Sequence, residues 1–317
     1  MIDNDVDFGD NCESESGTSD VCPRLKSDDL RHAFLIMAHR DDETLHALLR
    51  MLDDPRNDIY IHMDAKNTAW TESECLSMIE RGKCYIVPRV RVVWGGYSQI
   101  ECEISLLGCA VSNGPYAYYH LLSGQDLPIK SQDEIHCFFD SCGKKEFLRF
   151  ENHGRDYKRR MGGHVLWNAM GVSKRQTVLR KCNDIVSRLL QSVRRPSSHL
   201  EIKKGDNWFS ITDKLARYIV DNSLDIKSLF WDSFCGDELF LQTVAWNSDK
   251  KFNYYRKPGE RNDDALMRLI AWGEDESPRV FRLCDLDKIM SSGMLFARKF
   301  DCALDGEVVR EIERLVG

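Results

Sequence analysis

The 317-residue sequence lacks the features that mark several large protein classes. No apolar run approaches the roughly 20 residues that a transmembrane helix needs. Residues 1–28 contain neither the basic nor the apolar segment of a secretory signal. The net charge is −7, so the chain lacks the basic balance of a general nucleic-acid binder. We therefore expect a globular cytoplasmic protein that has no nucleic-acid partner.

Several chemical motifs are missing as well. Without GxGxxG or GxxxxGK[ST], neither a dinucleotide-binding turn nor a P-loop is predicted, and HExxH and GxSxG are also absent. The twelve cysteines include no CxxC pair, which argues against a structural zinc site. We expect mostly free thiols in a reducing compartment. A secreted, disulfide-bonded fragment of a longer precursor is the alternative.

The acidic triplets offer no evident site for a divalent metal ion. The three of the DxD type are 3–5, 5–7 and 285–287. The first two lie in residues 1–28, which we expect to be a disordered tail because they are acidic and aperiodic. The third is explained by Asp285 as the N-cap of a helix over 286–291. We expect no metal and no cofactor.

Apolar runs alternate with amphipathic stretches through the first half of the chain. The pattern predicts strands at 32–37, 58–63, 85–87, 91–94 and 118–122, and helices at 43–52, 72–81, 98–111 and 131–139. Such alternation is typical of βαβ units. The predicted fold class is α/β, with helices flanking a mostly parallel central sheet.

Ligands of parallel sheets bind outside the carboxyl ends of the strands. The polar residues that follow the predicted strands are His39, Asp64, Trp94–Gly96 and Ser123–Asp126. Taken singly, each is equally well explained as a solvated loop or a helix cap. Four such clusters in succession predict a binding edge.

Five segments occur in a recognisable order: VWGGYS (93–98), LLSGQDLPIK (121–130), GDNWF (205–209), GDE (236–238) and LFARKF (295–300). From about residue 31 to about 301 the sequence thereby resembles the core-2/I-branching β-1,6-N-acetylglucosaminyltransferases and their relatives, the peptide O-xylosyltransferases. The resemblance implies a GT-A-type nucleotide-sugar-binding fold, inversion at the anomeric carbon, and catalysis without a divalent metal. We expect residues 29–317 to form one such domain, donor-binding to about 150 and acceptor-binding and catalytic beyond.

The resemblance also implies roles for individual residues. The catalytic base falls on Glu238, in a segment where Gly236 replaces the proline of the relatives. Binding of the donor diphosphate falls on Lys299 and, with altered spacing before Asp285, on Arg279. We assign nucleotide contacts to His39, Asp64, Ser123 and Asp126, and acceptor contacts to Trp272, Trp208, Asp206 and Arg155, with Lys158 and Arg159 close to the last.

The chemistry of sugar transfer fits this set of residues. A carboxylate can accept the proton of the incoming hydroxyl, and fixed Lys and Arg charges can stabilise a departing diphosphate. If the segment holding Arg298 and Lys299 is extended, the two side chains point to opposite faces, so we expect one of them to reach the phosphates. Taken singly, Glu238 resembles a helix-start residue, Lys299 a surface charge, and the tryptophans packing residues.

We therefore expect an enzyme that moves GlcNAc from UDP-GlcNAc to a glycan hydroxyl, forming a β-1,6 linkage. A protein O-xylosyltransferase using UDP-xylose is the first alternative, and a catalytically silent sugar-binding protein is the second. The expected partners are a UDP-sugar and a carbohydrate or glycoprotein acceptor. Eukaryotic relatives are Golgi type II membrane proteins, whereas this sequence fits a bacterial-type cytoplasmic enzyme of polysaccharide synthesis. Any peripheral membrane contact is expected at Arg188–Arg195.

Overall fold

The computed structural model describes residues 31–151, 157–164, 168, 181–182, 185–190, 200–260, 262–274 and 277–317. The expected tail, Arg155 and residues 191–195 lie outside these ranges, and the side chains of Lys158 and Arg159 are not described.

The core is a five-stranded sheet of β1 (His32–Ala38), β2 (Asn57–Met63), β3 (Lys83–Ile86), β4 (Tyr118–Ser123) and β6 (Ser210–Thr212), in the order β3-β2-β1-β4-β6. The first four strands are parallel, and β6 runs antiparallel to β4. A smaller sheet has the order β5-β8-β7, from β5 (Asp126–Pro128), β8 (Phe296–Arg298) and β7 (Arg268–Ile270). The predicted α/β class with a mostly parallel sheet is confirmed.

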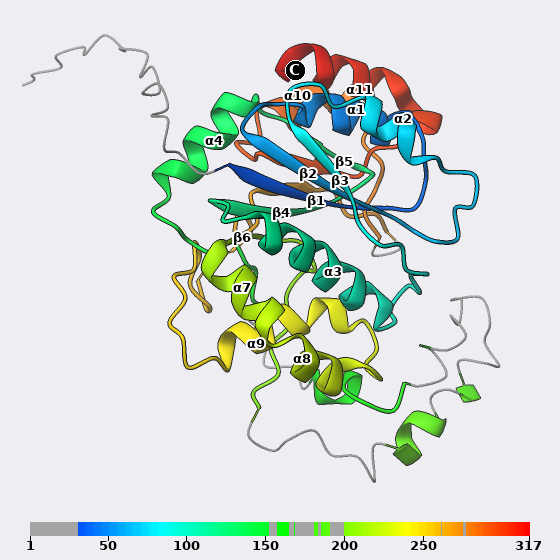
Figure 1. Cartoon of the computed structure of the whole chain (residues 1–317), viewed down its shortest axis with the longest axis vertical. Helices are drawn as coiled ribbons and strands as arrows, with labels where there is room; N and C mark the ends of the chain where they lie inside the picture. The colour runs from blue at the N-terminus through cyan, green and yellow to red at the C-terminus, as the bar shows by residue number, and fades with distance from the viewer. Residues whose placement is uncertain are drawn as a thin grey trace, which may run out of the picture.

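Helices cover both faces of the large sheet (Figure 1). On one side lie α1 (Glu43–Leu52), α2 (Glu72–Ser77), α10 (Leu286–Met290) and α11 (Cys302–Val316), and on the other α3 (Ser98–Asn113), α7 (Asp213–Asp221), α8 (Ser223–Phe230) and α9 (Phe240–Trp246). Further elements are α4 (Gln132–Ser141) and the 3₁₀ turns η1 (Tyr157–Arg160), η2 (Gly236–Glu238) and η3 (Leu283–Asp285). The two helical layers enclose two apolar clusters, one on each face of the sheet.

A buried arginine joins the two sheets. Arg268 of β7 donates to the main-chain carbonyls of Leu121 and Phe209, at 2.9 and 2.8 Å, and its guanidinium stacks over Phe296. Complete burial lowers its pKa to about 10. Because these carbonyls belong to β4 and to the segment before β6, Arg268 holds the small sheet against the large one.

Local chemistry explains where several helices begin. The Asp42 carboxylate accepts the main-chain N–H groups of Thr44 and Leu45, which start α1. Ser131 and Glu134 form a capping box at the start of α4. Both helices match their predicted positions to within two residues, because side-chain caps are local signals.

Three sequence-based predictions were wrong. The helix predicted over 72–81 ends at Ser77, because the Asp53 carboxylate takes the N–H groups of residues 80–82. Residues 91–94 form no strand; the chain leaves the sheet here, and the N–H of Val90 donates to the His62 ring instead of a strand carbonyl. Asp285 precedes α10, but its carboxylate binds Arg279 and the Arg282 N–H rather than capping that helix. Helix α11 was not predicted.

Three buried histidines meet beneath α4. Nε2 of His120 lies 3.0 Å from Nδ1 of His32, and Nδ1 of His120 lies 2.9 Å from the Ser210 hydroxyl. Nε2 of His136 lies 2.9 Å from the Asn57 side-chain oxygen, and the rings of His32 and His136 are 4.1 Å apart. Burial lowers the pKa of all three imidazoles, that of His136 to about 4. The cluster is therefore neutral at pH 7.

This cluster predicts a loss of stability in acid. Because the folded pKa values lie below that of an unfolded histidine, the unfolded state takes up protons first, and stability declines as the pH falls from about 6.5 towards 4. Each histidine adds up to about 1.4 kcal/mol per pH unit to this decline. In urea unfolding measured from pH 7.5 to 4.5, His136→Gln should show a shallower decline than the unsubstituted chain. Parallel curves would contradict this assignment.

Candidate functional site

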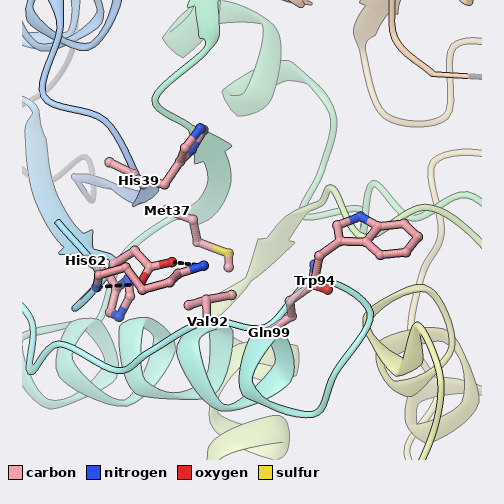
Figure 2. A pocket seen from close by; sticks show the side chains of 9 residues that line it. Met37, His39, His62, Val92, Trp94 and Gln99 are labelled. Atoms are coloured by element: carbon pink, nitrogen blue, oxygen red, sulfur yellow. Dashed lines mark hydrogen bonds and ion pairs between the residues drawn. The ribbon is translucent and has the colours of Figure 1, made fainter. Parts of the chain in front are cut away.

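A cavity of about 350 Å³ opens at the carboxyl ends of β1 and β2. It is lined by Met37, Ala38, His39, His62, Asp64, Lys66, Val92, Trp94 and Gln99. Figure 2 shows His39 and Trp94 at opposite ends of this pocket. Three of the four predicted strand-end clusters therefore meet here, whereas Ser123–Asp126 does not line the cavity.

Asp64 is held rigidly in the wall of the cavity. Its N–H donates to the Ala38 carbonyl at 2.8 Å, and its carboxylate accepts from the Lys66 N–H at 2.9 Å and lies 3.1 Å from the Lys66 ammonium. The Arg89 guanidinium donates to the carbonyls of Met63 and Asp64, each at 3.0 Å. The carboxylate thus faces the pocket from a turn that is fixed on both sides.

Ser123 and Asp126 mainly brace the turn between β4 and β5. The buried Asp126 carboxylate accepts from the N–H and the hydroxyl of Ser123, both at 2.9 Å. It also lies 3.5 Å from the Arg298 guanidinium at the end of β8. The turn is therefore tied electrostatically to the LFARKF segment.

Cations gather at the His39 end of the pocket. The pKa of Lys299 is lowered by burial and by the nearby charges of Arg298 and Arg40, and that of His39 by burial, Arg40 and Lys299. No carboxylate of the described residues lies within ion-pair distance of the Lys299 ammonium. A half-buried cation without such a partner is suited to an anionic ligand.

The two neighbouring basic residues of LFARKF have different surroundings. Arg298 stacks on the buried Trp208 ring at 4.2 Å, and its Nε and Nη1 have no hydrogen-bond partner within the described chain. Lys299 lies in the field of Arg298 and Arg40, and of the Asp301 and Asp126 carboxylates, and its charge acts on His39. That one of the pair faces the phosphates stays a prediction.

Arg279 is engaged elsewhere. Its guanidinium makes two 2.8 Å contacts with the Asp285 carboxylate and packs over Phe281. Within the described ranges no interaction joins it to Lys299. The structure therefore groups Lys299 with Arg40 and Arg298, which the sequence analysis did not assign to the diphosphate, rather than with Arg279.

Glu238 ends the η2 turn and has a half-exposed side chain. Its Oε2 accepts two 3.0 Å hydrogen bonds from the Arg160 guanidinium and lies 3.6 Å from the Lys204 ammonium. Arg160 also donates to the carbonyls of Phe234 and Cys235. Nothing in the described chain donates to Oε1. One carboxylate oxygen is thus held while the other accepts no hydrogen bond within the described chain, and neither cation was identified from the sequence.

The WGGYS segment connects this turn to the pocket. The Cys235 N–H donates to the Gly95 carbonyl at 2.7 Å. Gln99, which lines the pocket, donates from Nε2 to the Asp237 carboxylate at 3.0 Å. The residue before Glu238 in the chain, Asp237, therefore contacts the pocket wall directly through Gln99.

A Cβ at the first residue of GDNWF or of GDE would come too close to neighbouring atoms. A Cβ on Gly236 would lie 2.2 Å from the Ser233 hydroxyl and 3.0 Å from Ile100 Cδ1, so the proline of the relatives would not fit here without a shift. A Cβ on Gly205 would lie 1.8 Å from the Arg149 carbonyl. The Gly205 N–H donates to the Glu238 carbonyl at 3.0 Å, so this close approach fixes the backbone of Glu238.

The residues assigned to the acceptor differ in exposure and in contacts. Trp272 is 57% exposed, whereas Trp208 is buried under Arg298. The Asp206 carboxylate lies 3.0 Å from the Arg149 guanidinium. Trp272 is therefore the assigned aromatic whose ring is open to a ligand.

No group of three or more His, Cys, Asp or Glu side chains among the described residues is placed to hold a metal ion. No helix in that part of the chain is both long and apolar enough to cross a membrane.

Comparison with known proteins identifies related sequences. The family model for the Core-2/I-Branching enzyme matches residues 32–291. Xylosyltransferase 1 of Canis lupus familiaris is 22% identical over 307 residues, which cover 90% of this chain and 30% of that protein. The N-acetyllactosaminide beta-1,6-N-acetylglucosaminyl-transferase of Homo sapiens is 23% identical over 297 residues, covering 85% of this chain and 68% of that protein. The chain spans less than a third of the length of the xylosyltransferase.

The packing at Gly205 predicts a strong effect on stability. Gly205→Ala forces its Cβ against the Arg149 carbonyl and should cost about 3 kcal/mol of unfolding free energy. Gly108→Ala is the matched control, because its Cβ would meet nothing within 4 Å inside α3, and it should stabilise by about 0.5–1 kcal/mol. If urea unfolding gave the same change in unfolding free energy for both substitutions, the close approach of Gly205 to the Arg149 carbonyl would not constrain the fold.

Proposed function

Because the chain belongs to the family of Core-2/I-branching enzymes, we propose that it is an inverting, metal-independent glycosyltransferase that moves GlcNAc from UDP-GlcNAc to a carbohydrate or glycoprotein hydroxyl. The observation that carries the proposal is the pocket between the cations around Lys299 and the turn that carries Glu238. A base at one end and cations at the other are what displacement of a diphosphate requires.

In this proposal Glu238 is the catalytic base. The Arg160 guanidinium and the Lys204 ammonium hold Oε2, so the carboxylate is fixed in one orientation. Oε1 then accepts the proton of the acceptor hydroxyl as the hydroxyl oxygen attacks the anomeric carbon. A single in-line displacement inverts that carbon and expels UDP.

The departing diphosphate is assigned to Lys299. Arg40 and Arg298 add positive potential nearby, although Arg40 is paired with Asp42 and Asp301 and Arg298 lies 3.5 Å from Asp126. Charges fixed in a half-buried site stabilise a developing anion without the reorganisation that water would need. Arg279 keeps its assigned role only if it releases Asp285, to which it is bound through two contacts. We therefore rank Lys299 above Arg279 as a diphosphate ligand.

The nucleotide is assigned to the main cavity, with contacts from Asp64 and His39 in its wall. A volume of about 350 Å³ lies in the range of small-molecule sites. Ser123 and Asp126 act in this proposal through the turn that they brace against Arg298. The acceptor is assigned to the exposed face of Trp272, with Asp206 and Arg155.

Xylosyl transfer from UDP-xylose is the second candidate. It is favoured by the similarity to xylosyltransferase 1, which has almost the same identity to this chain as the GlcNAc transferase. Both candidates use the same base and the same cations, so the walls of the sugar subsite decide between them.

Replacement of the base tests the mechanism. Glu238→Gln keeps the shape of the side chain but cannot accept a proton, so kcat should fall by about 10²–10⁴-fold while the KM for the donor changes little. Glu311→Gln, a half-exposed carboxylate on α11 paired with Arg314, is the matched control and should leave kcat unchanged. Retention of near-full transfer by Glu238→Gln would remove Glu238 as the base.

A donor screen tests the substrate and the metal independence. Release of UDP and thermal stabilisation are measured with UDP-GlcNAc, UDP-xylose, UDP-GalNAc, UDP-galactose and UDP-glucose in EDTA. Preference for UDP-GlcNAc is expected, and Lys299→Ala should weaken the stabilisation more than Arg279→Ala. Preference for UDP-xylose would select the second candidate, and a response only after Mn²⁺ is added would contradict the cation assignment.

A further inference from the structure

Two carboxyl groups are buried behind the η2 turn. Glu103, on the inner face of α3, is wholly inaccessible, and Asp237 is buried directly before Glu238. Helix α3 and turn η2 pack against each other. Neither oxygen of Glu103 has a hydrogen-bond donor within the described chain, and the same holds for Oδ1 of Asp237. Three carboxyl oxygens without donors are therefore concentrated in one buried region.

Among the described charged groups that act on these two carboxyl groups, Arg160 is the one cation, and it lies on the η2 side. On the η2 side, Arg160 and Glu238 act on Asp237, and Cys235 lies in the same turn. On α3, Glu103 adjoins Cys102, which also lies in the field of Glu101 and of Asp64 at the end of β2. Among the described residues, Asp237 is the charged group that acts on Glu103.

Two such groups cannot both be ionised without a large cost, because each is desolvated and each repels the other. Burial and Asp237 raise the pKa of Glu103 well above its usual value. Burial and Glu238 raise the pKa of Asp237 to about 7. At neutral pH at least one of the two therefore carries a proton, which makes that carboxylic acid a hydrogen-bond donor.

We propose that Glu103 is a positioning residue for the transfer reaction: its carboxylic acid donates a hydrogen bond to Oδ1 of Asp237 and so fixes the turn that presents Glu238. The inference rests on the proposed role of Glu238 as the base. Asp237 is then held from two sides, since Gln99 donates to its Oδ2 at 3.0 Å. Arg160 holds Glu238 itself. Helix α3 thus fixes the backbone of the turn, and Arg160 fixes the side chain of the base.

The proposed pair makes the turn sensitive to alkaline pH. When its proton is lost, two negative charges face each other in a buried space, and a third is present on Glu238. Glu238 should then be displaced, so the activity of the unsubstituted enzyme should show an alkaline limb that belongs to the Glu103–Asp237 pair.

Two substitutions at Glu103 test the proposal through kinetics. Glu103→Gln keeps a donor that cannot be titrated, so it should keep kcat within a few-fold and lose the alkaline limb. Glu103→Leu removes the donor, and kcat should fall by about ten- to a hundredfold with little change in the KM for the donor. Glu101→Gln, an exposed residue on the same helix, is the control. A Glu103→Leu enzyme with unchanged kcat and pH profile overturns the proposal.

A stability measurement keeps this test separate from that of the proposed function. The folded pKa values of the pair lie above those of unfolded carboxyl groups, so its contribution is fully present below pH about 4.5 and is lost as the pH rises through 7. Urea unfolding should therefore show stability falling with pH in the unsubstituted chain relative to Glu103→Gln. Parallel curves of stability against pH for these two proteins overturn the proposed Glu103–Asp237 hydrogen bond, regardless of the role of Glu238. If the two stability curves differ with pH but the Glu238→Gln enzyme remains active, the Glu103–Asp237 pair is retained and only the role of Glu238 as the base is rejected.

Discussion

The constraint on which the site depends is the parallel register of β1, β2 and β4. In this register Ala38 lies beside Met63, and Met37 lies beside both His62 and Ser123. The three strands therefore end at one edge of the sheet, and the residues that follow them are brought together although the chain separates them widely. The main cavity forms at this edge, between the ends of β1 and β2.

The second half of the chain completes the site by attaching to this edge at a few polar contacts. Arg268 ties the small sheet to the carbonyls of the large one, which brings Arg298 and Lys299 to the His39 end. Gln99 and the Gly95 carbonyl receive the η2 turn at the other end. The turn with the proposed base thus contacts the pocket wall through Gln99, and Lys299 lies near His39, although neither Glu238 nor Lys299 lines the cavity itself.

The turn that carries Glu238 is supported by charges of both signs. Arg160 and Lys204 face the outer carboxylate, whereas the buried Glu103 and Asp237 lie behind it. Cations outside and a shared proton inside, as we propose, keep the local charge near balance although three acidic groups lie close together. Such a balance matters because unpaired buried charge is costly.

Sequence patterns predicted those elements that have local causes. The continuous apolar run of β1 and the caps at Asp42 and Ser131 depend on residues near one another in the chain, so β1, α1 and α4 were placed well. The helix over 72–81 was overextended because the carboxylate that ends it, Asp53, comes from a distant segment. The family was likewise readable from segments such as LSGQD and LFARKF, and the match over 32–291 confirms it.

What the sequence by itself determined was the α/β class, the family, and a set of candidate residues that included Glu238, Lys299 and Asp64. Only the tertiary structure decided their surroundings: that Arg279 is bound to Asp285, that Arg298 lies on Trp208, and that Arg160 holds Glu238. Glu103 carried no signal at all, since an acidic residue in an amphipathic helix is ordinarily exposed. The physical reason is that burial and charge pairing arise between distant segments, whereas a motif records only neighbours along the chain.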